Sequence, residues 1–92
     1  MRKFKHRQDL IGNYFVSTND TFDQGLETMV FPASSDAREV LGFSGWHHWV
    51  GVDFWNPIEK YTRHYTTKKQ AIEGHKNTIS ELKEAMNNDS AQ

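Results

Sequence analysis

"YTTKKQAIEGHKNTISELKEAM", residues 65–86, is the stretch that decides the fold, because its apolar side chains recur at the spacing of an α-helix. Thr67, followed three residues later by Gln70, is typical of a capping box at a helix N-terminus. We therefore predict a helix over residues 67–88 and a short tail at 89–92. One side of this helix carries a stripe of residues, spaced by three and four from the second member onward: Ala71, Ile72, His75, Ile79, Leu82 and Met86.

Two residues of this stretch, Gly74 and His75, are unusual for an amphipathic helix. A buried imidazole needs a partner, since an unpaired buried polar group costs about 1–3 kcal/mol. Glu27 and the hydroxyls of Tyr61 and Tyr65 are the candidate partners, and we predict a buried polar pair of His75 with Glu27. Gly74 is expected to let the helix approach the sheet. A general base or metal ligand at His75 is the alternative to this structural role.

The chain before the helix predicts strands. Residues 13–18 and 26–31 are rich in β-branched and aromatic side chains and flank turn-forming residues, which indicates a hairpin. Residues 46–55 form a third predicted strand, and residues 59–66 a fourth at the sheet edge. Residues 32–45 lack alternation and are expected to form a loop. The predicted fold class is α+β, a two-layer sandwich in which a four-stranded, mainly antiparallel sheet packs on one C-terminal helix.

Length and composition set the remaining limits. Ninety-two residues make a single domain, with a basic segment at 1–10, the sheet at 13–66 and the helix after it. The absence of cysteine excludes disulfides and thiolate metal sites. No apolar run reaches the roughly 18 residues that a membrane-spanning helix needs, and the N-terminus lacks the apolar stretch of a signal peptide. We expect a cytoplasmic protein with no membrane contact.

The strand at 46–55 carries the candidate binding surface. Its two faces are predicted from alternation: a core face of Trp46, His48, Val50, Val52 and Phe54, and an outer face of His47, Trp49, Gly51, Asp53 and Trp55. Because one helix covers only one side of the sheet, the outer tryptophans are expected to stand on an open face. The predicted partner-binding residues are Trp49, Trp55, His47 and Asp53. Two alternatives stay open: the loop at 32–45 folds over them, or this open face pairs two copies as a homodimer.

A nucleic-acid or nucleotide interface is a second functional hypothesis. It would use the basic residues of the first segment: Arg2, Lys3, Lys5 and Arg7. The net charge of −1 and the acidic character of residues 20–39 count against it.

A metal-dependent enzyme centred on His75 is a third hypothesis. His47 and His48 are neighbours on a strand, so they point to opposite faces and cannot chelate one ion together. His64 could approach either across a hairpin. The sequence holds no Gly-rich phosphate loop, Ser-His-Asp pattern or paired-carboxylate motif. We therefore assign no catalytic residue, no metal and no cofactor, and favour a protein that is not an enzyme.

The order of motifs resembles one protein group. "VST" at 16–18, "ETMVF" at 27–31 and the pattern YxTxxxAxxGH at 65–75 resemble a group of small uncharacterised proteins encoded by tailed bacteriophages and prophages. The likeness spans residues 13–80, with a shorter link before "ETMVF" and more tryptophan in "GWHHWVGVDFW". It implies a phage-encoded accessory protein in the host cytoplasm. The leading expectation is thus a non-catalytic binding module that acts on a host or anti-phage defence protein.

Overall fold

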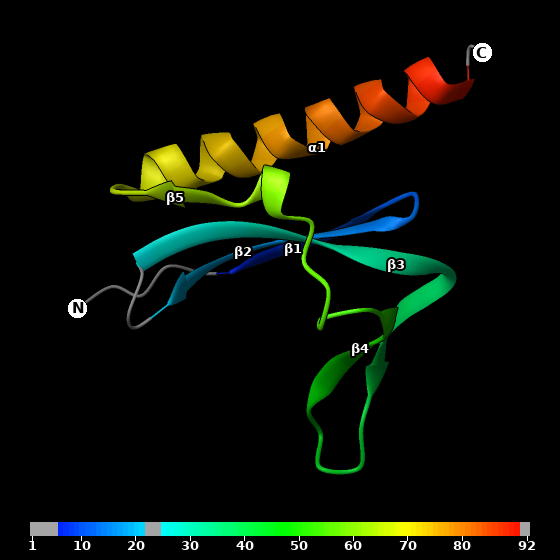
Figure 1. The fold of residues 1–92 in the computed structure, drawn as a ribbon. Coiled ribbons are helices and arrows are strands. Elements are labelled where there is room, and N and C mark those ends of the chain that lie inside the picture. The colour runs from blue at the N-terminus through cyan, green and yellow to red at the C-terminus, as the bar shows by residue number, and fades with distance from the viewer. Residues whose placement is uncertain (1–5, 22–24, 91–92) are drawn as a thin grey trace.

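The computed structural model describes residues 6–21 and 25–90, except the side chains of the last two of these. A long helix lies over one face of a sheet, and a two-stranded extension of the sheet bends away below it (Figure 1). The elements in chain order are β1 (Arg7–Ile11), β2 (Tyr14–Thr21), β3 (Gly25–Leu41), β4 (His47–Val52), a 3₁₀ turn (Glu59–Tyr61), β5 (Arg63–Tyr65) and α1 (Lys68–Ser90).

The strands among the described residues form one antiparallel sheet that curls as a half-barrel. Its order is β1-β2-β3-β4, and β5 pairs with β3 beside this path. With α1 on one face, the predicted α+β class and its sheet-on-helix arrangement are confirmed. The β2–β3 hairpin predicted at 13–18 and 26–31 is present, and its register places Val16 opposite Val30 and Thr18 opposite Thr28.

The predicted loop at 32–45 is wrong in its first part. β3 continues to Leu41, and its second half pairs with β4 to make a two-stranded arm, residues 33–52, which we call the ribbon. The register shifts between Ala33 and Arg38, so β3 contains extra residues there. Such a bulge interrupts the apolar–polar alternation, which is why the sequence of this segment looks irregular. Gly51 lies opposite the shift with φ of 79°, a backbone conformation that glycine adopts without strain.

The predicted fourth strand at 59–66 is shorter than expected. Residues 59–61 form a 3₁₀ turn, and of the predicted strand only the part in β5, Arg63–Tyr65, pairs with β3. β4 and β5 run along the same side of β3, because Asp53 N–H donates to Pro32 O at 2.9 Å and Ile58 N–H to Val30 O at 2.8 Å. Residues 54–57 therefore bulge out of an otherwise continuous path along β3.

The segment 1–10, expected to be a basic N-terminal extension, contributes a strand. Arg7–Ile11 pairs with residues 14–18 of β2, and a tight turn at Gly12 and Asn13 joins the two strands. Its sequence, RQDLI, has only two apolar residues, and they pack on different clusters: Leu10 on that of Phe15 and Ile11 on that of Val16. A strand formed by backbone pairing at a sheet edge leaves little apolar signal in the sequence.

The helix begins as its sequence predicts. Thr67 Oγ1 accepts a hydrogen bond from Gln70 N–H at 3.1 Å, and Gln70 Oε1 accepts one from Thr66 N–H at 3.0 Å, so the capping box is confirmed with its return bond one residue earlier. The helix runs to Ser90, past the predicted end at residue 88, and residues 91–92 of the expected tail lie outside the described residues. Its buried side chains are Ala71, His75, Thr78 and Leu82.

Apolar packing occupies both faces of the sheet. Val16, Val30 and Leu82 form the cluster under the helix. Phe15 and Phe31 form the other on the opposite face, together with Ala33 and the half-buried Trp49 and Val52 of the ribbon. The ribbon thus folds back far enough to cover part of the face that the helix leaves bare.

Gly74 has the packing role that the sequence predicts. A Cβ at this position would overlap the ring and hydroxyl of Tyr65, whose hydroxyl donates to Thr28 Oγ1 at 3.0 Å. A second link between α1 and β5 is the ion pair of Arg63 with Glu81 at 2.7 Å, whose hydrogen bond lowers the pKa of the Glu81 carboxyl. No helix in the described part of the chain has the length and apolarity needed to cross a bilayer.

Candidate functional site

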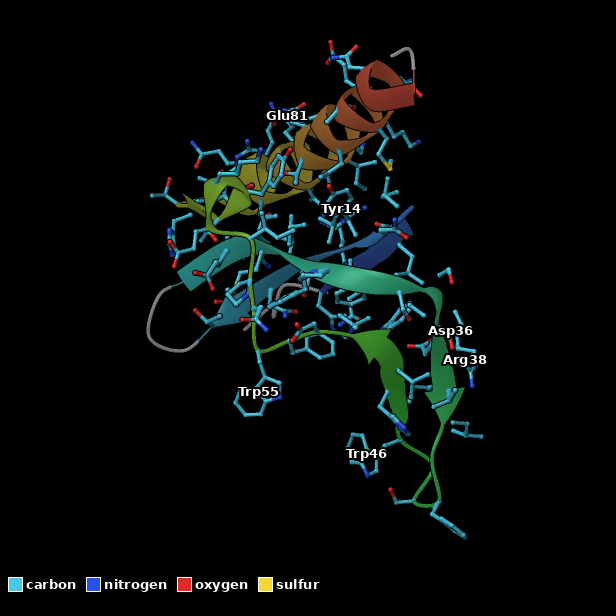
Figure 2. The ribbon with its side chains drawn as sticks, turned by 45° about the vertical axis from the view of Figure 1, so that its right-hand side comes forward. Tyr14, Asp36, Arg38, Trp46, Trp55 and Glu81 are labelled. Atoms are coloured by element: carbon cyan, nitrogen blue, oxygen red, sulfur yellow. The ribbon has the colours of Figure 1, made fainter. Side chains whose placement is uncertain are left out.

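The exposed large apolar side chains of the described residues all lie in one segment. They are Leu41 at 65%, Phe43 at 113%, Trp46 at 75%, Phe54 at 46% and Trp55 at 90% exposed, and we call them the aromatic surface. Three belong to the tip of the ribbon and two to the bulge that follows β4. Figure 2 shows the rings of Trp46 and Trp55 projecting into solvent on the side of the sheet away from the helix. Large exposed apolar patches are typical of interaction sites, so these residues are the candidate site.

Trp49, predicted to be an exposed binding residue, is instead the anchor of the ribbon. Its ring is half-buried, with its centroid 4.8 Å from that of Phe15, and its Nε1–H donates to Gln8 Oε1 at 3.0 Å. Trp49 and Val52 both pack on the same cluster although they differ in parity. The positive φ of Gly51 between them reverses the alternation, so the predicted division of this strand into two faces is wrong.

The two aromatic residues that follow β4 differ in their surroundings: Phe54 packs on other rings, whereas Trp55 is exposed. Phe54 contacts Phe15 and Phe31 edge-on, at centroid distances of 5.5 and 5.1 Å. Trp55 is held outward by a turn in which the Asp53 carboxylate accepts its backbone N–H at 3.1 Å. The other Asp53 oxygen accepts the Asn56 side-chain amide at 2.8 Å. Asp53, predicted to bind a partner, therefore shapes the turn that presents Trp55.

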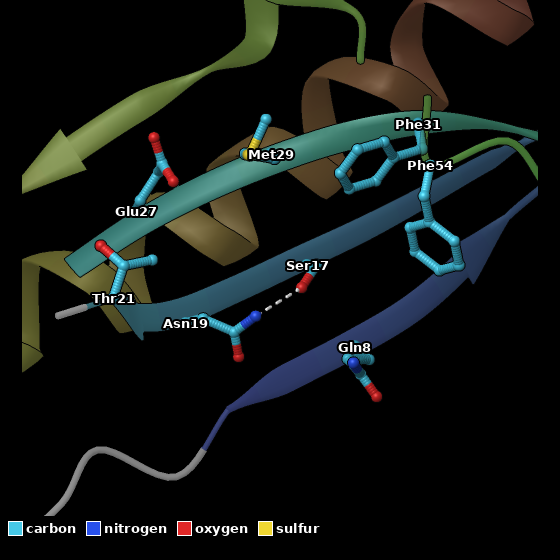
Figure 3. Close-up of a pocket in the computed structure, with 8 residues that line it drawn as sticks. All are labelled: Gln8, Ser17, Asn19, Thr21, Glu27, Met29, Phe31 and Phe54. Carbon is cyan, nitrogen blue, oxygen red and sulfur yellow. Dashed lines mark hydrogen bonds between the residues drawn. The ribbon is translucent and has the colours of Figure 1, made fainter. Parts of the chain in front are cut away.

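Two hollows adjoin the aromatic surface. One, of about 520 Å³, separates the ribbon tip from the start of β1. It is lined by His6, Gln8, Glu39, Gly45, Trp46, His47 and Trp49. The other, of about 200 Å³, lies on the open face of the sheet between β1 and Phe54 (Figure 3). Its polar side chains include Asn19 and Ser17, joined at 3.2 Å. Both hollows extend the area that a bound partner could cover.

The ribbon and the residues that directly follow it carry more acidic than basic side chains. Residues 34–56 carry the carboxylates of Asp36, Glu39 and Asp53 against the single guanidinium of Arg38. The Ser34 hydroxyl donates to Asp36 at 2.5 Å, and this bond holds the pKa of that carboxyl below its usual range. His47, a predicted binding residue, is exposed and lies 3.9 Å from Glu39. Glu39 lines the same hollow as Trp46, and Asp53 accepts the backbone N–H of Trp55, so a carboxylate lies near each exposed indole.

His75 is buried, as predicted, but with partners other than those expected. Its Nδ1 is 2.7 Å from Thr18 Oγ1, and its Nε2 is 2.7 Å from the Asp9 carboxylate. Thr18 Oγ1 in turn lies 2.6 Å from Thr28 Oγ1. The predicted pair with Glu27 is wrong: this residue faces the other side of the sheet, where it lies 2.8 Å from His64 Nε2.

The chain of bonds has one consistent direction. Tyr65 donates to Thr28, which can donate to Thr18 and through it to Nδ1 of His75. The remaining ring proton on Nε2 then points to Asp9. Thus one row of hydrogen bonds joins α1 to β1, β2, β3 and β5. It resembles an acid–histidine–hydroxyl triad, but Thr18 is fully buried, so no substrate reaches that hydroxyl, and the arrangement serves packing.

The structure describes only some of the residues that the two alternative functions would use. Arg2, Lys3 and Lys5 lie outside the described residues, and Arg7 is exposed on β1. Within residues 6–21 and 25–90, no three acidic, histidine or cysteine residues are grouped so as to hold a metal ion. His47 pairs with Glu39 and His64 with Glu27, on different parts of the sheet.

Sequence reasoning missed Trp46 and Phe43 as parts of the surface. The signal was present in "GFSG", residues 42–45, whose two glycines indicate a hairpin turn directly before the third predicted strand. Comparison with known proteins adds no assignment: no family model, curated protein or solved structure matches the chain.

Proposed function

We propose that this protein is a non-catalytic binding module, and that the aromatic surface binds a partner protein. In this proposal it is a phage-encoded accessory protein that acts in the host cytoplasm on a host or defence protein. The observation that supports binding is the concentration of every exposed large apolar side chain of the described residues within positions 41–55. Tryptophan is enriched among the residues that dominate binding energy at protein interfaces.

The way the rings are presented also supports this function. Trp49 fixes the ribbon against β1 and β2, and the Asp53 turn fixes Trp55, so the exposed rings are carried on ordered backbone. A preorganised surface loses less conformational entropy when it binds. Exposed apolar rings such as Trp46 and Trp55 favour aggregation, so a binding role gives a reason for their presence at the surface. The acidic side chains around them favour a partner with a basic rim.

Replacement of both exposed indoles, Trp46→Ser with Trp55→Ser, is expected to abolish partner capture and leave the fold intact. Each ring at the centre of an interface contributes about 2 kcal/mol or more, which is roughly a 30-fold loss of affinity. Because neither ring is buried, the free energy of unfolding should change by less than about 0.5 kcal/mol. The measurement is affinity capture from bacterial host lysate, quantified by mass spectrometry, alongside urea unfolding.

A matched control carries Lys76→Ser and Glu84→Ser, two exposed positions on the helix. This variant should capture the same proteins as the wild type. If the tryptophan variant retains those proteins at wild-type levels, the aromatic surface is not the binding site.

A further inference from the structure

The outer edge of β4 has no partner strand among the described residues. β4 pairs with β3 alone, and its other edge faces the side on which Trp46 and Trp55 lie in Figure 2. Gly42 N–H donates to Trp46 O at 2.8 Å, which makes these two a hydrogen-bonded pair. Because bonded and non-bonded pairs alternate along an antiparallel ladder, the backbone N–H and C=O groups of His47 and Trp49 point away from β3.

This edge also lacks the charged side chains and prolines that commonly prevent strand addition. Edge strands are commonly protected by charged side chains or proline. β1 carries Arg7 and Asp9, and β5 carries Arg63. β4 reads HHWVGV, with no proline, lysine, arginine or carboxylate. Its six residues span about 20 Å.

We propose that an extended, basic segment of the partner protein pairs with β4 as an additional strand, with Trp46 and Trp55 contacting its two ends. This inference rests on the proposed function and specifies its mode of binding. Main-chain hydrogen bonds to His47 and Trp49 set the register of the segment. The exposed indoles receive its apolar side chains, as in other cases of strand addition.

Charge selects this occupant over a second copy of the chain. Glu39 lies opposite Trp49 of β4, and Asp53 directly follows Val52, the last residue of β4, while Arg38 is the single lysine or arginine of residues 34–56. Two copies paired through β4 would bring these carboxylates together, and like charges across an interface weaken association. Lysine and arginine in an incoming segment are attracted by the same groups.

The test starts from a pool of random twelve-residue peptides displayed and selected on the wild-type protein. The selected peptides should be rich in β-branched residues with lysine or arginine, and their binding should protect the amides of His47 and Trp49 from hydrogen exchange. His47→Pro removes an outward N–H and should weaken binding about tenfold or more, whereas His47→Thr keeps that N–H and should bind as the wild type does.

Backbone N-methylation of the selected peptide gives a readout that does not depend on how the variant folds. Methyl groups at alternate positions should each weaken binding about tenfold, and those between them should have little effect, because only every second amide faces β4. Equal effects at all positions, or binding by His47→Pro at the wild-type level, would overturn strand addition. Lysate capture that still depends on the two tryptophans would then leave the proposed function standing. Protection of the same amides by raising the protein concentration alone would identify a second copy as the occupant and refute a basic segment.

Discussion

His75→Leu is expected to destabilise the protein by about 2–4 kcal/mol, although leucine suits a buried helix position. The substitution removes the acceptor of the Thr18 hydroxyl, which is fully buried, and the donor to Asp9. It therefore takes one of the two hydrogen bonds from the buried Thr18 hydroxyl, which keeps only its bond with Thr28, and it removes the hydrogen bond between the helix and β1. The measurement is urea unfolding followed by circular dichroism of the helix.

The matched control is His64→Leu. This residue lies 2.8 Å from Glu27, but about half of its side chain is exposed, so the loss should stay below about 1 kcal/mol. If His75→Leu unfolds within 0.5 kcal/mol or so of the wild type, the row of hydrogen bonds does not hold the helix to the sheet.

Gly51→Ala is expected to dislodge the ribbon and to destabilise the protein by about 2–4 kcal/mol. A Cβ there would lie 2.7 Å from Ser34 Oγ and 2.8 Å from the Ala37 Cα, and the second of these is backbone that cannot turn aside. The φ of 79° adds strain for any residue with a side chain. Loss of the Trp49 contact should appear as a red shift of tryptophan emission.

Gly45→Ala is the matched control, because it adds the same backbone strain as Gly51→Ala without a steric overlap at the new Cβ. Its φ of 82° is as unfavourable, yet nothing lies within 4 Å of an added Cβ. This variant should lose about 1–2 kcal/mol at most and keep the Trp49 environment. Equal effects of the two alanines would show that the close approach of β4 to the β3 bulge has no energetic importance.

The parts of the fold that the sequence predicted are those with a regular pattern. The helix at 67–88 follows from its three-and-four spacing and its capping box, and the hairpin of β2 with β3 follows from two β-rich runs around a turn. The bulge of β3 and the reversal at Gly51 have no periodic signal, so both the ribbon and the orientation of Trp49 were mispredicted.

The candidate site was predicted in outline only. The burial of His75 followed from its place on the stripe, but its partner Asp9 is 66 residues away, in a segment whose polarity hid a strand. Trp55 was correctly expected on the exposed side. Trp46 and Trp49 exchanged roles, because tertiary packing of the ribbon, and not local alternation, decides which indole meets Phe15.

The most direct test measures how well a neutral quencher reaches each tryptophan in three single-tryptophan proteins, with the other two indoles replaced by phenylalanine. The account predicts strong acrylamide quenching of Trp46 and Trp55, and weaker quenching of Trp49, which is half-buried against Phe15. Proteins captured from lysate by the wild type, once purified and added in excess to the Trp46 and Trp55 proteins, should shield the indole that each of these keeps. Equal quenching of all three indoles, or no shielding of either Trp46 or Trp55, would contradict it.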